Sequence, residues 1–100
     1  MSSPKLILIL SERAKGDIAE ILQYTYEQWG EARVDAYAAV IDKALSIISE
    51  YPLIGRKAPE ISELHRVMEA GQHRVFYSVT DSAIHVARVL HRKMEIKGRL

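Results

Sequence analysis

The chain has 100 residues, of which 48% are hydrophobic and 27% are charged, and its formal net charge is +1. These fractions are typical of a globular protein, and they exclude a disordered tail, a collagen-like repeat and a low-complexity chain. The length predicts a single domain over residues 1–100 with a core of its own. Because there is no cysteine, disulfide scaffolds, cysteine zinc sites and thiol catalysis are excluded. We expect a cytoplasmic protein, since the apolar run at residues 6–10 is too short to span a bilayer and residues 1–10 lack the features of a signal peptide.

The small net charge conceals a difference between the two halves of the chain. Residues 1–50 carry five Lys or Arg and eight Asp or Glu, whereas residues 51–100 carry nine and five. All four histidines lie in the second half. Such an asymmetry favours an anionic partner for the second half, and the alternative is that the basic side chains only solvate the surface of a sheet.

The first half of the chain predicts a strand followed by two helices. Residues 5–10 form a continuous apolar run of strand length, which predicts a strand covered on both faces. Ser11 can cap a helix, and apolar side chains then recur at helical spacing as far as Trp29. Gly30 ends this helix, and a second helix runs from Glu31 to the residues before Pro52. The short link between them predicts an antiparallel hairpin.

The second predicted helix has a wide apolar surface. Its main stripe runs through residues 34–48, and a second edge carries Ala36, Val40 and Ile47. Together they cover roughly half of the helix circumference, which is more than one packing partner requires. The helix is therefore either wedged between its neighbour and a sheet, or it leaves part of this surface to an external partner.

The second half of the chain predicts a three-stranded meander. After the loop-rich residues 51–62, alternating patterns at residues 66–70, 73–79 and 84–91 indicate strands joined by tight turns. The alternation places Phe76 and Tyr77 on opposite faces of the sheet, with one buried and the other facing the helices or a partner. Residues 94–100 form a short basic tail. The order β-α-α-β-β-β predicts an α+β fold, a helical hairpin packed on a small, mostly antiparallel sheet.

Site motifs are few. The sequence contains neither a phosphate-binding glycine motif nor a His-Glu-x-x-His motif, so we expect no cofactor. We also expect no metal, because His85 and His91 share a face of the last strand at a spacing too long for one ion.

Basic side chains on the meander are the remaining candidates for a chemical role. They could bind phosphate, with a histidine as general acid or base. The alternative is that the arginines at positions 66 and 88 form ion pairs with the glutamates at 60, 63 or 69. The cluster comprises Arg66, His73, Arg74, Arg88 and His91.

Three blocks carry a family resemblance: LSERAKGDIAEILQYTYEQWG at residues 10–30, YPLIGR at 51–56, and RVMEAGQHRVFYSVTDSAIHVARVLHRKM at 66–94. Together with the element order, they resemble the ParE toxins of type II toxin–antitoxin modules, in the RelE/ParE superfamily. The resemblance covers nearly the whole chain. It implies a toxin that poisons DNA gyrase, contributes to plasmid stabilisation and is neutralised by a ParD-like antitoxin. That antitoxin would be a ribbon-helix-helix protein, through which the toxin contacts DNA indirectly.

The resemblance also suggests surfaces for these partners. An antitoxin helix would lie on the wide apolar surface of the second helix, at Ala36, Tyr37, Val40 and Ile47. The target would meet the basic second half and tail, at Arg56, Arg74, His91, Arg92, Lys93, Lys97 and Arg99.

Two other functions stay open at this point. RelE-type relatives cut mRNA on the ribosome, and Glu60, Arg74 and His91 fall near the places of their catalytic side chains. The chain lacks the tyrosine that follows this histidine in the nuclease pattern, and its basic loop is reduced to Arg56 and Lys57. The third interpretation is an inactive relative that only binds an antitoxin.

Some of these motif residues also have structural interpretations. We expect Trp29 to close the end of the hairpin and Arg56 to bond local carbonyls. For His91, a packing role and a vestigial catalytic role are both open.

Overall fold

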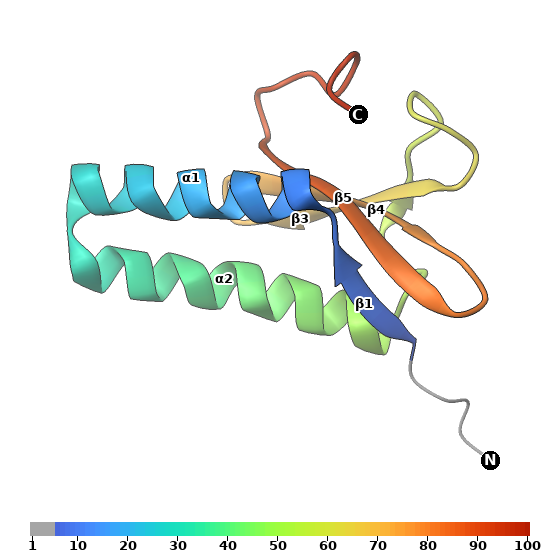
Figure 1. Ribbon diagram of the computed structural model, residues 1–100, viewed down its shortest axis with the longest axis horizontal. Helices are drawn as coiled ribbons and strands as arrows, with labels where there is room; N and C mark the ends of the chain where they lie inside the picture. The colour runs from blue at the N-terminus through green and yellow to red at the C-terminus, as the bar shows by residue number, and fades with distance from the viewer. Residues whose placement is uncertain (1–5) are drawn as a thin grey trace.

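The computed structural model describes residues 6–100, in which a helical hairpin packs on one face of a sheet (Figure 1). The elements are β1 (Ile7–Leu10), α1 (Glu12–Trp29), α2 (Glu31–Glu50), β2 (Arg56–Lys57), β3 (His65–Ala70), β4 (His73–Val79) and β5 (Ala83–His91). The predicted α+β class and the hairpin on a mostly antiparallel sheet are confirmed. The two-residue strand β2 lies inside the predicted loop at residues 51–62, so the order has one strand more than predicted. Lys5, part of the predicted first strand, lies outside the described residues.

Both helices begin and end at the predicted signals. The Oγ atom of Ser11 accepts a hydrogen bond from the backbone N–H of Ala14 at 2.9 Å, which satisfies one free donor of the first turn of α1. Gly30 then reverses the chain with φ at +86°, a conformation that side chains disfavour. No helix among residues 6–100 combines the length and apolarity needed to cross a membrane.

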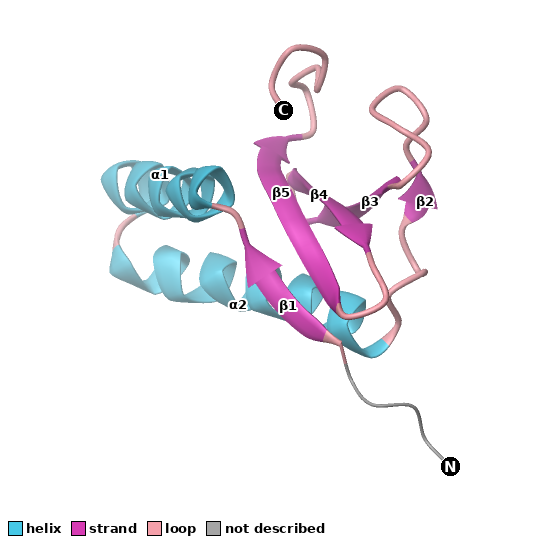
Figure 2. Ribbon diagram, turned by 45° about the vertical axis from the view of Figure 1, so that its right-hand side comes forward, coloured by secondary structure: helices cyan, strands magenta, loops and turns pink. Residues whose placement is uncertain are grey.

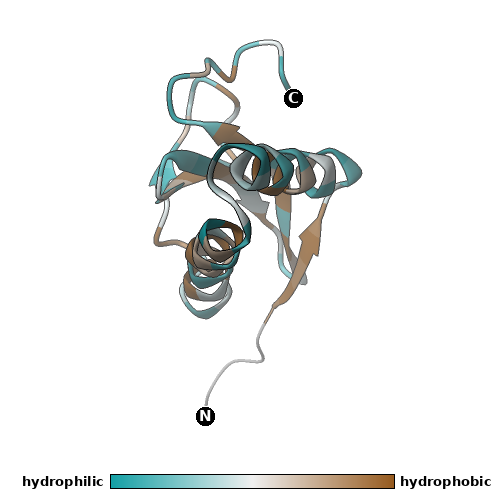
Figure 3. Cartoon of the chain, turned by 90° about the vertical axis from the view of Figure 1, so that its left-hand side faces the viewer, coloured by the Kyte–Doolittle hydropathy of each residue, from teal (hydrophilic) through white to brown (hydrophobic). Residues whose placement is uncertain are grey.

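The sheet has the strand order β1-β5-β4-β3-β2. The predicted meander β3-β4-β5 is antiparallel, whereas β1 pairs in parallel with β5, with Ile7 opposite Ala83. The prediction that the first strand is covered on both faces is wrong, because β1 lies at the edge of the sheet and the helices cover only one side. Ile7 is 67% exposed and Ile9 is 44% exposed, and Figure 3 shows β1 as a hydrophobic edge strand.

Both faces of the sheet carry a hydrophobic cluster. The helix-facing cluster includes Tyr77, which is fully buried. The opposite face, called the outer face here, has a smaller cluster that contains Phe76, which is 4% exposed. Ile61 from the loop after β2 and Ile96 from the C-terminal segment pack on this second cluster, and Figure 2 shows both segments rising from the sheet. The C-terminal residues are therefore part of the packing rather than a free tail.

An irregularity in β5 changes which face its side chains occupy. Arg88 pairs with Phe76, but the next pair is Val86 with Tyr77, so Ala87 is an extra residue on β5. Such a bulge shifts the alternation by one. The prediction that His85 and His91 share a face is therefore wrong.

Candidate functional site

One candidate site is a groove of about 310 Å³ between the helical hairpin and the β3–β4 turn. Tyr24 and Trp29 are 63% and 65% exposed. The guanidinium carbon of Arg33 lies 5.2 Å from the centroid of the Trp29 ring, which is within cation–π range. We call this the helix-side groove, and it is lined by Ile21, Tyr24, Thr25, Trp29, Arg33, Tyr37, Gln72, His73 and His91.

The floor of the helix-side groove is a hydrogen-bonded aromatic cluster. The hydroxyl of Tyr37 accepts from the backbone N–H of Gln72 at 2.9 Å and lies 2.5 Å from Nδ1 of His73. The His73 ring is edge-on to both Tyr37 and His91, with centroids 5.4 and 5.3 Å apart. Burial lowers the pKa of His73, and the charge of His91 lowers it further, while burial raises the pKa of Tyr37. Tyr37 and His73 are therefore uncharged near neutral pH.

The second candidate site is a hollow of about 600 Å³ on the outer face. Its lining includes residues of the C-terminal segment and of the loop after β2, and these two segments rise from the sheet in Figure 2. Basic side chains outnumber carboxylates among its lining residues. We call it the outer-face hollow, and it is lined by Arg56, Glu60, Arg74, Phe76, Arg92, Lys93, Met94, Glu95, Ile96 and Lys97.

The basic side chains of this hollow differ in their pairing. Arg56 lies 4.0 Å from the carboxylate of Glu60, rather than on local carbonyls as predicted. Nε of Arg74 donates to Glu69 at 3.0 Å. The Arg56–Glu60 pair is solvent-exposed and the Arg74–Glu69 pair is only half-buried, so both contribute little to stability. Among residues 6–100, no ion pair involves the cations at positions 92, 93 and 97, which leaves the hollow with a positive charge.

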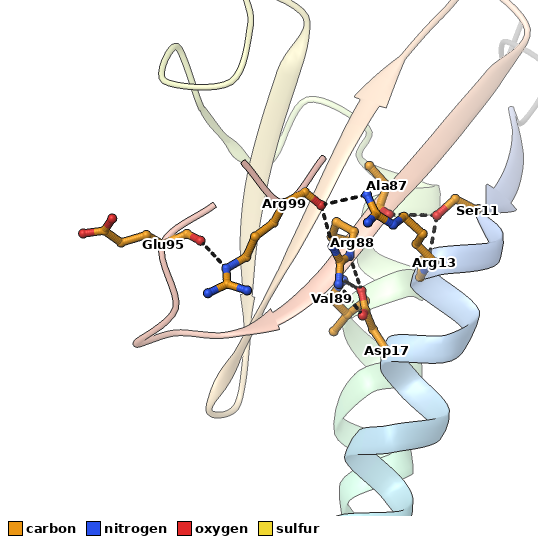
Figure 4. Close-up of polar contacts among 9 residues, drawn as sticks. Ser11, Arg13, Asp17, Ala87, Arg88, Val89, Glu95 and Arg99 are labelled. Carbon is orange, nitrogen blue, oxygen red and sulfur yellow. Dashed lines mark hydrogen bonds and ion pairs between the residues drawn. The ribbon is translucent and has the colours of Figure 1, made fainter. Parts of the chain in front are cut away.

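A buried ion pair joins α1 to β5 (Figure 4). The carboxylate of Asp17 accepts two hydrogen bonds from the guanidinium of Arg88, both at 2.8 Å, and a third from the backbone N–H of Val89 at 3.0 Å. The hydrogen bond to Asp17 raises the pKa of Arg88, so the guanidinium stays charged. The predicted pairing of Arg88 with a glutamate at 60, 63 or 69 is wrong, because Arg88 lies past the end of β1, where α1 reaches the free edge of β5.

The C-terminal segment is hydrogen-bonded to Arg88 of this ion pair. The backbone carbonyl of Arg99 accepts hydrogen bonds from the guanidinium groups of Arg88 and Arg13 (Figure 4). Nε of Arg99 itself donates to the carbonyl of Glu95 at 2.7 Å. The side chain of Arg99 is therefore engaged within its own segment.

The loop between α2 and β2 is anchored by side chains of the sheet. The Tyr77 hydroxyl accepts from the N–H of Gly55 at 2.9 Å and donates to the carbonyl of Pro52 at 2.8 Å. Arg66 donates to the carbonyls of Leu53 and Gly55 at 3.2 and 2.8 Å, so its predicted pairing with a glutamate is wrong. Only glycine fits at position 55, because a Cβ there would lie 2.6 Å from the Tyr77 hydroxyl. The Pro-x-x-Gly-Arg block thus fixes the loop to the sheet.

Residues 8–96 match the profile of a family described as "ParE toxin of type II toxin-antitoxin system, parDE". The chain belongs to the ParE toxin family. It is 36% identical over 93 residues to Toxin ParE1 of Mycobacterium tuberculosis (strain CDC 1551 / Oshkosh), covering 92% of this chain and 95% of that protein. It is 32% identical over 91 residues to Toxin ParE1 of Caulobacter vibrioides, covering 91% and 94%.

Solved structures support the fold of this ParE-family toxin. The chromosomal ParDE TA system from P. aeruginosa has a chain that superimposes with a TM-score of 0.76 at 14% identity, covering 89% of this chain and 98% of that one. The RelBE2 complex from Mycobacterium tuberculosis has a chain with a TM-score of 0.65 at 21% identity, covering 89% and 100%.

Most of the residues predicted to meet the target come together in this ParE-family toxin. Two do not: His91 lies in the helix-side groove, and Arg99 is bonded within the C-terminal segment. The residues that share the outer-face hollow are Arg56, Arg74, Arg92, Lys93 and Lys97.

The predicted nuclease set does not converge. Glu60 and Arg74 line the outer-face hollow. His91 pairs across the strands with His73, whose ring contacts Tyr37 of α2 on the helix side of the sheet. Histidine and arginine therefore lie on opposite faces. Among residues 6–100, no three His, Asp or Glu side chains are grouped to hold a metal ion.

The residues predicted to bind an antitoxin follow one edge of α2. Ala36 is exposed, Val40 is 37% exposed and Ile47 is half-buried. Tyr37 is half-buried, and its hydroxyl is engaged at the β3–β4 turn. The sequence reasoning missed the neighbouring helix-side groove, although the aromatic residues that end α1 were a signal for it.

Proposed function

We propose that this ParE-family toxin poisons DNA gyrase without enzymatic chemistry and that a ParD-like antitoxin neutralises it. The observation that supports this most is the separation of Arg74 and His91 onto opposite faces of the sheet. A general acid or base must reach the same substrate as the groups that stabilise its charge, so this arrangement weighs against an mRNA endonuclease. Plasmid stabilisation and a cytoplasmic location remain predictions from the sequence.

The outer-face hollow is the surface that we assign to the target. Its basic side chains come from three separate parts of the chain, and Ile96 packs the C-terminal part onto the sheet. Deleting residues 93–100 would therefore remove packing as well as charge. A double substitution, Lys93→Gln with Lys97→Gln, removes charge alone.

A gyrase cleavage assay tests the proposed target. Purified toxin is incubated with gyrase and supercoiled plasmid, and linear DNA is measured after detergent and protease treatment. We expect linear DNA to accumulate, and to decrease with Lys93→Gln/Lys97→Gln although antitoxin binding is retained. Toxin mixed beforehand with its antitoxin is the control. Codon-linked mRNA cuts on the ribosome without trapped gyrase cleavage would instead support an endonuclease, and neither activity would support an inactive relative.

The antitoxin is expected along the edge of α2. The exposed side of Val40 and the half-buried Ile47 offer apolar area to an amphipathic helix, which is a common mode of recognition. The solved ParDE system and RelBE2 toxin–antitoxin complex support an antitoxin as the partner.

Charged substitutions on this edge test the antitoxin surface. Val40→Glu and Ile47→Glu should each weaken antitoxin binding by about tenfold or more, since a buried unpaired charge costs at least about 1.4 kcal/mol. Isothermal titration calorimetry measures the affinity, and thermal unfolding checks the fold. Ala39→Glu on the exposed side of α2 is the matched control. Variants that unfold, or an equal loss with Ala39→Glu, would show that this edge is internal core or unrelated to the antitoxin.

A further inference from the structure

The outer-face hollow contains positive charge that the fold does not neutralise. Five basic side chains and two glutamates line it. Arg92, Lys93 and Lys97 are exposed and take part in no ion pair among residues 6–100. Unpaired cations gathered in one concave surface attract a polyanion.

The surrounding structure holds these cations in place. Ile96, which lies between Lys93 and Lys97 in the sequence, packs on the cluster that contains Phe76 and Leu90. The N–H of Arg92 donates to the carbonyl of Gln72 at 2.9 Å, which fixes the start of the segment. The cations are therefore presented on an ordered segment, which reduces the entropy that binding would cost.

The hollow lacks the groups that read unpaired bases. Single-stranded nucleic acids bind by stacking bases on exposed aromatic rings. Phe76, the aromatic side chain in the lining, is 4% exposed and lies beneath the packed segments. Exposed rings such as Tyr24 and Trp29 belong to the helical hairpin on the other side of the sheet. These features favour contacts to phosphates over contacts to bases.

We propose that the outer-face hollow binds the phosphodiester backbone of double-stranded DNA directly, with Arg92, Lys93 and Lys97 as its main contacts. This inference rests on the proposed gyrase poisoning and extends it. In the gyrase–DNA complex, the toxin would bind the DNA as well as the enzyme. The contact is independent of base sequence, because it involves phosphates alone. The DNA contact of the toxin itself is distinct from the indirect contact through an antitoxin.

Fluorescence anisotropy of the purified toxin with a labelled duplex, in the absence of gyrase, tests the proposal. We expect binding at about 50 mM salt that weakens linearly on a log–log plot as salt rises. Lys93→Gln/Lys97→Gln should weaken binding at low salt and reduce the slope by about 0.9 for each phosphate that the variant no longer neutralises. The matched control, Lys15→Gln/Lys43→Gln, removes the same charge from exposed positions on the helical hairpin and should leave binding nearly unchanged.

Three results would overturn the proposal. One is the absence of duplex binding at about 50 mM salt, where contacts to phosphates are strong. The second is tighter binding to single-stranded DNA or to RNA of the same length. The third is an equal decrease in binding with the control variant. Trapped gyrase cleavage without duplex binding would contradict only this inference, whereas duplex binding without trapped cleavage would contradict only the gyrase function.

Discussion

The buried pair between Asp17 and Arg88 gives the sharpest stability prediction. Their side chains are 9% and 15% exposed, and the carboxylate also accepts the N–H of Val89. Asp17→Ala leaves the guanidinium of Arg88 buried without its partner and the N–H of Val89 without its acceptor. The N–H of Val89 then has no acceptor, and the guanidinium keeps only its hydrogen bond to the carbonyl of Arg99.

The expected cost follows from this geometry. Removing one partner of a buried ion pair destabilises a protein by about 3–5 kcal/mol. The missing acceptor of the backbone N–H places Asp17→Ala towards the upper end of that range. Such a loss is a large part of the roughly 5–15 kcal/mol that stabilises a typical folded protein. For a chain of 100 residues, it corresponds to a melting temperature lower by about 12 °C or more.

Urea unfolding followed by circular dichroism measures this change. Glu27→Ala, at an exposed position of the same helix, is the control and should change stability by no more than about 0.5 kcal/mol. Asp17→Leu combined with Arg88→Met removes both charges and should recover stability to within about 2 kcal/mol of the parent. A cost below about 1 kcal/mol for Asp17→Ala, or a double variant as unstable as the sum of the two single variants, would refute the reasoning.

Two further predictions concern stability. Gly55→Ala forces a Cβ to within 2.6 Å of the Tyr77 hydroxyl and should cost about 1–3 kcal/mol, whereas Gly16→Ala, with open space around it, should gain up to about 1 kcal/mol by the same urea assay; equal effects would contradict the close packing. Burial and the charge of His91 lower the pKa of His73 below 6.5, so the unfolded chain takes up a proton there before the folded chain does. The stability present above about pH 6.5 is therefore lost as the pH falls through the lower folded pKa, and His73→Gln should reduce the difference between the urea midpoints at about pH 7.5 and 5.5. An unchanged difference would assign the titration to another group.

The helices and the meander were predictable because their signals are local. Ser11 caps its own first turn, Gly30 adopts the positive φ that its position requires, and alternation from His73 to Val79 is read along a single strand. Each of these depends on residues a few positions apart, so the pattern in the chain contains the physical cause. The blocks that carry the family resemblance, at residues 10–30, 51–56 and 66–94, include the first helix and the strands of the meander.

The candidate sites were only partly predictable, because they depend on contacts between distant residues. The excess of basic residues in the second half could be counted in the sequence. That cations from β2, β4 and the C-terminal segment line one hollow depends on the packing of Ile96 against the sheet. The extra residue Ala87 moves every later side chain of β5 to the other face of the sheet. No local sequence pattern predicts this bulge.

The fold class, the family and the uneven charge could be read from the amino-acid chain alone, since composition, periodicity and motifs are properties of the chain. In contrast, the folded molecule was needed to show that Arg74 and His91 lie on opposite faces and that Asp17 pairs with Arg88, 71 residues away. The physical reason is that a strand register and a buried ion pair are fixed when separate elements pack together. The near-neutral net charge thus divides between the acidic first half of the chain, with the helical hairpin, and the basic second half, whose outer face we propose as the site for a polyanion.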